Sequence, residues 1–159
     1  MFVLDCSATM AWFFEDEATD YTQAILDTLA AGEIAVVPSL WLLEVTNILL
    51  VGERRGRNSV EQAKAFWEIL QALPIKIEAY SLEQCSTSIY DLARTHNLSA
   101  YDAAYLDLAQ KYSLPLATLD KRLIKAAKAC GVLLWAMPTH QNLEDINLEQ
   151  GLYIKDLNG

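Results

Sequence analysis

Short apolar runs alternate with longer segments of helical periodicity along most of this chain, and this alternation most constrains its fold. The short runs predict five strands, at residues 2–6, 34–37, 75–78, 116–118 and 132–134. Neighbouring parallel strands need a long connection between them, and a helix usually provides it. The alternation therefore predicts an α/β fold, a three-layer sandwich whose central parallel sheet of four to five strands carries helices on both faces.

The longer segments have apolar residues three and four positions apart, which is typical of helices. They predict six helices, at residues 19–31, 39–51, 59–73, 81–96, 99–112 and 121–129. Gly32 and Gly131 follow the first and the last helix, where glycine commonly ends a helix. Ser59 and Gln62 have capping-box spacing at the start of the third helix. Pro38 ends the second strand, because its ring removes a donor from the ladder.

The size and hydropathy of the chain indicate one domain. Its 159 residues are 53% hydrophobic, which is enough for one well-filled core. Periodicity weakens after Met137, so we expect a domain at residues 1–137 and a C-terminal extension at residues 138–159 that packs on the domain or on a partner. No run of about 18 apolar residues is present, so a membrane span is not expected.

Two features indicate a cytoplasmic protein. The N-terminus has no basic leader, and Asp5 comes too early for the apolar core of a signal peptide. The cysteines, Cys6, Cys85 and Cys130, have no CxxC spacing. Their number and spacing favour reduced, packed thiols over a disulfide framework or a zinc site.

The net charge opposes simple nucleic-acid binding. It is −9, from 21 acids against 12 lysines and arginines, whereas nucleic-acid binders usually carry a basic surface. Part of the excess lies in the tail, and another part is explained if carboxylates cluster around cations that offset their charge. Two basic clusters could contact phosphates, although helix-end charges explain most of them. The clusters are Arg54, Arg55 and Arg57, and Lys121, Arg122, Lys125 and Lys128.

Two acids end apolar runs: Asp5 ends the run at residues 2–4 and Asp120 ends the run at residues 116–119, so each lies at the carboxyl edge of a predicted strand. The carboxyl ends of parallel strands lie at one edge of the sheet, where ligands bind in open α/β folds. Either acid alone could equally be a helix cap or a turn residue. Two acids at the same edge favour a shared site.

Glu44 lies on a largely apolar helical stripe formed by Leu40, Trp41 and Ile48. Burying a lone carboxylate costs several kcal/mol unless a partner or a metal compensates it. The alternative is an exposed Glu44 that pairs with Arg54 or Arg55 near the end of the helix. Asn47, one turn further on, could orient an acid on this face.

Asp102 follows Ser99 by three positions, a spacing that alone indicates a helix-capping box. Leu106 and Ala109, one and two turns further on, are apolar, so the helix directs Asp102 toward the interior. Asp107 lies about 140° around the same helix. We therefore expect Asp107 to be solvated and outside the site.

Carboxylates from separate elements suit hard cations such as Mg²⁺. One or two such ions could activate water and stabilise the leaving oxygen in phosphodiester cleavage. The expected ligands are Asp5, Glu44, Asp102 and Asp120.

Each of these acids lies in a recognisable motif. The motifs are VLDCS at residues 3–7, LEVTN at 43–47, LSAYDAAY at 98–105 and ATLDKRL at 117–123. In this order and with these gaps, they resemble the motifs of the PIN-domain family, specifically the VapC-type toxins of bacterial and archaeal toxin-antitoxin pairs. Cys6 stands where a small Ala or Thr is commoner in that family.

The resemblance implies a PIN-like fold and an endoribonuclease that depends on Mg²⁺ or Mn²⁺, the toxin of a type II toxin-antitoxin system. It also implies a homodimer and a small cognate antitoxin that blocks the acidic cleft. It assigns the catalytic and metal-binding roles to Asp5, Glu44, Asp102 and Asp120, and hydrogen-bonding support to Ser7, Asn47 and Thr118. Apolar surface beyond the needs of one small core also favours a dimer; we expect it to include Trp12, Trp41, Trp67 and Trp135.

Other functions fit parts of the same pattern. An enzyme of the haloacid dehalogenase type also begins with an acid after its first strand, but its D-x-D pattern requires a second acid where Ser7 stands. A housekeeping RNA-processing nuclease would share all four motifs. A catalytically silent binding module would be expected to lack one of the acids, and all four are present.

Overall fold

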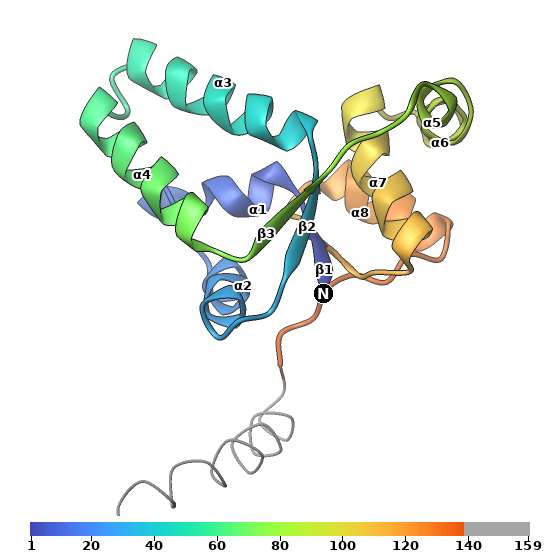
Figure 1. The fold of residues 1–159 in the computed structure, drawn as a ribbon, viewed down its shortest axis with the longest axis horizontal. Helices are drawn as coiled ribbons and strands as arrows, with labels where there is room; N and C mark the ends of the chain where they lie inside the picture. Colours follow the sequence, from blue (N-terminus) through green and yellow to red (C-terminus); the bar gives the residue numbers. More distant parts are fainter. Residues whose placement is uncertain (139–159) are drawn as a thin grey trace, which may run out of the picture.

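The computed structural model describes residues 1–138 and is built around one sheet (Figure 1). The sheet has four parallel strands in the order β3-β2-β1-β4. Their bounds are β1 Phe2–Leu4, β2 Ala35–Pro38, β3 Ile75–Glu78 and β4 Leu116–Ala117. β1 lies inside the sheet, and its residues are at most 1% exposed. Such burial on both faces explains why this strand is an unbroken apolar run.

The fifth predicted strand is reduced to a single bridge. Leu134 forms one parallel bridge with Leu116 beside β4, and the backbone N–H of Trp135 donates to the carbonyl of Leu116 at 2.9 Å. Leu133 is 76% exposed, so this segment leaves the sheet after minimal pairing. The sheet therefore has the lower of the two expected strand numbers.

Helices cover both faces of the sheet, as predicted. Figure 1 shows α1 to α4 on one side of the strands and α5 to α8 on the other. The bounds are α1 Cys6–Met10, α2 Asp20–Ala30, α3 Leu40–Arg54, α4 Val60–Ala72, α5 Leu82–Ser86, α6 Ser88–His96, α7 Ala100–Tyr112 and α8 Lys121–Ala129, with a 3₁₀ turn η1 at Glu15–Glu17. The three-layer α/β sandwich is confirmed.

Two helical predictions were incomplete. The helix predicted at residues 81–96 is broken at Thr87, whose φ of −124° and ψ of −92° are not helical. Its hydroxyl donates to the carbonyl of Glu83 at 2.7 Å, and such local bonds compete with the helical ladder. The other omission is α1, which has five residues and is too short to show a 3.6-residue period.

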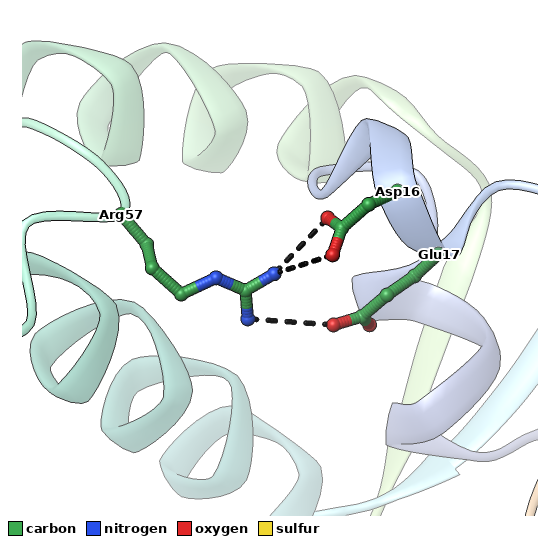
Figure 2. Close-up of polar contacts among 3 residues, drawn as sticks. All are labelled: Asp16, Glu17 and Arg57. Atoms are coloured by element: carbon green, nitrogen blue, oxygen red, sulfur yellow. Dashed lines mark hydrogen bonds and ion pairs between the residues drawn. The ribbon is translucent and has the colours of Figure 1, made fainter.

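Two acids of η1, Asp16 and Glu17, are held by one arginine from the turn between α3 and α4 (Figure 2). Arg57 Nη2 lies 3.0 and 3.1 Å from the two carboxylate oxygens of Asp16, and Nη1 lies 3.5 Å from Glu17 Oε1. The guanidinium carbon also lies 4.0 Å from the centroid of the Phe14 ring. Arg57 therefore joins the α3–α4 pair to the segment that follows α1.

Several compositional expectations can be compared with the structure. Among residues 1–138, no helix is long and apolar enough to cross a membrane. The three cysteines are unpaired, and Cys6 is buried, but Cys85 is exposed, so the expectation of packed thiols was wrong for Cys85. Apart from Pro138, the expected extension at residues 138–159 lies outside the described residues.

Candidate active site

The order of the strands places a topological switch beside β1. The chain passes from β1 to β2 and β3 on one side, and β4 then pairs with the other side of β1. In open α/β sheets, ligands bind outside the carboxyl ends of the strands at such a switch. Asp5 directly follows β1, and Thr118 directly follows β4. The backbone N–H of Asp5 donates to the carbonyl of Ala117 at 2.9 Å, which fixes the two strand ends together.

The Asp5 carboxylate is buried and held by two hydroxyl groups. It is 4% exposed, and Oδ2 accepts hydrogen bonds from Ser7 Oγ at 2.5 Å and Thr118 Oγ1 at 2.8 Å. Burial raises the pKa of Asp5, and the nearby charge of Asp102 raises it further, while the two hydrogen bonds lower it. Ser7 and Thr118 thus lie where hydrogen-bonding support was predicted.

Glu44 reaches the same region from α3. Its Oε1 accepts a hydrogen bond from the Tyr105 hydroxyl at 2.7 Å. Partial burial raises the pKa of Glu44 to about 7, the Tyr105 hydrogen bond opposes this rise, and the charges of Asp5 and Asp102 add to it. Within the described residues, neither Arg54 nor Arg55 pairs with Glu44, so the alternative ion pair is not formed.

Asp102 begins α7 and has the capping contacts that its spacing indicated. Its backbone N–H donates to Ser99 Oγ at 3.0 Å, and this hydroxyl donates to Asp102 Oδ2 at 2.8 Å. The side chain is only partly buried. Its charge acts on both Asp5 and Glu44. The cap therefore does not remove Asp102 from the group of acids; it fixes the position of the carboxylate.

Asp120 is joined to this group through Thr118. Its backbone N–H donates to Thr118 Oγ1 at 3.0 Å, and the same hydroxyl donates to Asp5. Its Oδ1 accepts from the backbone N–H groups of Arg122 at 2.7 Å and Leu123 at 3.0 Å. Asp120 therefore caps α8, as the helix-cap alternative predicted. It is also linked to Asp5 through Thr118.

Asn47 and Asp107 differ from expectation. Asn47 is exposed and makes no side-chain hydrogen bond to Glu44 in the part of the chain that the structure describes. Asp107 was expected to be solvated, which is wrong: it is 7% exposed. Gln84 Nε2 donates to Asp107 Oδ2 at 3.0 Å, so Asp107 is held by α5.

Tyr105 is a polar contact of the site that the sequence prediction missed. It is 0% exposed and lies three positions after Asp102, which places both on one side of α7. That spacing is the signal that could have identified it. An aromatic residue in an apolar stretch is otherwise interpreted as core, and Tyr105 is indeed part of the core.

The donor set can be compared with the needs of a divalent cation. Among residues 1–138, no group of three or more His, Cys, Asp or Glu side chains is arranged closely enough to hold a metal ion as it stands. The chemistry of the group nevertheless fits a hard cation, because every candidate ligand is a carboxylate oxygen. The acids also disfavour one another's charged forms, and a cation between them would remove this repulsion.

Comparisons with known proteins agree with this fold. A family model described as the PIN domain matches residues 2–129. The chain is also 31% identical over 125 residues to Ribonuclease VapC3 of Pyrobaculum aerophilum, a match that covers 76% of this chain and 90% of that protein.

Two solved structures are similar in fold. VapBC2 from Rickettsia felis, bound to a DNA fragment from the promoter, matches with a TM-score of 0.60 at 16% identity and covers 84% of this chain and 96% of that one. VapC20 from Mycobacterium tuberculosis, described as a sarcin-ricin loop cleaving toxin, matches with a TM-score of 0.59 at 14% identity and covers 87% of this chain and 100% of that one.

The fold and the acids at its switch point define an α/β domain of the PIN type. The family match covers most of the chain, so the chain belongs to the PIN-domain family. Within that family, it is similar to the VapC-type proteins.

Proposed function

We propose that this protein is a divalent-metal-dependent endoribonuclease and the toxin of a type II toxin-antitoxin pair. The observation that carries the proposal is the buried Asp5 carboxylate at the switch point, close enough to Glu44 and Asp102 for their charges to interact. The names of a ribonuclease relative and of a toxin with a similar fold support the reaction and the substrate class. A two-component structure of similar fold supports a small antitoxin partner.

In this proposal, Asp5, Glu44, Asp102 and Asp120 would hold one or two Mg²⁺ or Mn²⁺ ions. When bound, the metal would supply a water of lowered pKa and positive charge beside the phosphate. The remaining residues orient the ligands: Ser7 and Thr118 hold Oδ2 of Asp5, and Tyr105 holds Oε1 of Glu44. These three hydrogen bonds do not use Oδ1 of Asp5 or Oε2 of Glu44, so those two oxygens would be the ones that face a metal ion.

The test is cleavage of unstructured and looped RNA by the purified protein, freed of any antitoxin. We expect cleavage with Mg²⁺ or Mn²⁺ and none after chelation. Asp5→Asn keeps the size of the side chain but removes its charge, so cleavage should fall at least about 100-fold. Asp107→Asn is the matched control, because Asp107 is also a buried acid but contacts Gln84 on α5; it should keep near-normal activity.

Full metal-dependent cleavage by Asp5→Asn would show that the site is assigned wrongly. Wild-type protein that cuts no RNA with either ion would favour the catalytically silent binding module. A housekeeping nuclease would also cut RNA, so toxicity on expression in cells, and its relief by a protein encoded beside this gene, distinguishes a toxin from that alternative.

A further inference from the structure

One helix, α8, carries four cations and no acid, and it forms a basic cluster separate from that of Arg54, Arg55 and Arg57. α8 has nine residues and no acid in its sequence KRLIKAAKA. Its inner face is buried through Leu123, Ala126 and Ala127. Its outer residues include four of the 12 lysines and arginines of the chain, which are Lys121, Arg122, Lys125 and Lys128. Within residues 1–138, none of these four forms an ion pair.

Beside this row lies a pocket of about 340 Å³ between the end of α6 and α8. No acidic side chain lines it. Thr95, His96 and Asn97 form the wall from α6, and Arg122 and Lys125 are the charged residues of the wall from α8. The pocket therefore offers hydroxyl, amide and cationic groups, which are the groups that bind phosphate oxygens.

Arg122 is held in place in this pocket. Its Nη2 donates to the carbonyl of Asn97 at 2.8 Å, and Asn97 is the left-handed residue that ends α6, with a φ of 52°. A guanidinium has five N–H donors, so this bond leaves donors for a second partner. The bond also satisfies a carbonyl at the end of α6, which explains Arg122 structurally but gives no role to Lys125.

The row of cations begins at the candidate active site. Asp120 caps α8 and is followed at once by Lys121. At about 1.5 Å per residue, Lys125 and Lys128 lie about 7.5 and 12 Å along the helix from Asp120. A polyanion that enters the site at Asp120 can therefore extend along α8.

We propose that the pocket between α6 and α8, together with the outer face of α8, binds backbone phosphates of the RNA. The inference rests on the proposed ribonuclease function, and it adds the surface along which the RNA lies. The four site acids repel RNA, and phosphate contacts supply most of the affinity that is independent of sequence. The row of cations on α8 begins beside Asp120, and this continuity with the candidate active site favours RNA over an acidic polypeptide as the ligand.

The test is binding of a labelled, unstructured RNA to the full chain in the presence of a chelator, so that cleavage does not interfere. For each phosphate of single-stranded RNA that the protein contacts, the logarithm of the binding constant falls by about 0.7 for a tenfold rise in salt. At about 0.1 M salt, Lys125→Gln should therefore weaken binding about fivefold, and Lys125→Gln with Lys128→Gln about 25-fold, equally for different RNA sequences. Lys64→Gln is the matched control, an exposed lysine on α4, and should leave the affinity unchanged.

The possible outcomes separate this inference from the function on which it rests. RNA binding and cleavage that are equal in wild type and in both α8 variants would overturn the phosphate site and leave the ribonuclease standing. A wild-type chain that neither binds nor cuts RNA would overturn both. If polyglutamate binds as tightly as RNA and loses affinity in the same variants, the surface is one for an acidic protein, and the proposal is wrong.

Discussion

Glu44 is a carboxyl group whose charge depends strongly on its surroundings. Its pKa rises from 4.5 to about 7, first because of burial, while Tyr105 opposes the rise and the charges of Asp5 and Asp102 add to it. A carboxyl group whose pKa is higher in the folded chain binds more protons when folded. The metal-free protein therefore has a stability contribution from Glu44 that is present below pH about 4.5 and is lost as pH rises through about 7.

This linkage predicts how the metal-free protein responds to pH. Between pH 5 and 8, the free energy of unfolding should fall by on the order of 1–2 kcal/mol, a value reduced by solvent screening of the partly exposed Glu44. Glu44→Gln cannot titrate and should flatten this slope, whereas Glu68→Gln, an exposed residue on α4, should keep it. Urea unfolding in chelator at several pH values measures this, and a stability that rises over the interval would contradict it.

At the residue scale, the sequence predicted those contacts that follow from position along a strand. Asp5 and Thr118 follow adjacent parallel strands, so their proximity is a consequence of the sheet. The Tyr105 bond joins residues 61 positions apart and depends on where the fold places α3 relative to α7, which no local pattern shows. The burial of Asp107 was missed for the same reason, because it depends on tertiary contacts such as the hydrogen bond from Gln84 on α5.

At the element scale, Arg57 is the polar tie between the α3–α4 pair and η1. Its ion pairs with Asp16 and Glu17 are exposed, and such pairs contribute little individually. Its contact with the Phe14 ring adds a cation–π term. Three weak contacts on one side chain still restrain the turn that leads out of α3, the helix that carries Glu44.

Replacing this tie should have a modest effect. We expect Arg57→Ala to lower the free energy of unfolding by about 0.5–1 kcal/mol, measured by urea unfolding at low salt. Arg54→Ala is the control, because Arg54 is exposed and makes no ion pair among residues 1–138; its effect should be smaller. Equal effects of the two variants would show that Arg57 acts only through its charge.

The elements themselves were predictable where hydrophobic periodicity alone decides them. Helices with a long apolar stripe, such as α3 and α8, were located to within a few residues. The break at Thr87 was not, because it depends on hydroxyl bonds to Glu83. The fifth strand was predicted wrongly because a three-residue apolar run does not show how many residues pair with the neighbouring strand; here only Leu134 forms a bridge.

At the scale of the whole molecule, the apolar surface differs from the one that the tryptophans indicated. Trp41 is 2% exposed, so that expectation was wrong for Trp41, whereas Trp12, Trp67 and Trp135 pack against the core but are only partly buried. The exposed apolar side chains lie elsewhere. On α3, Leu43 and Leu50 are 74% and 44% exposed, and seven positions place them on one face of the helix.

We expect a homodimer that covers this face of α3, because leaving large apolar side chains in water is unfavourable. Leu43 is next to Glu44 in the sequence, so the partner would lie near the candidate active site. Sedimentation at tens of micromolar should show a dimer, because an interface of about −8 kcal/mol already associates at about 1 μM. Leu43→Asp should give a monomer, while Leu82→Asp, on α5 and 87% exposed in the wild type, should remain a dimer. A wild-type monomer at that concentration would rule out the dimer, and a dimer that survives Leu43→Asp would place its interface away from α3.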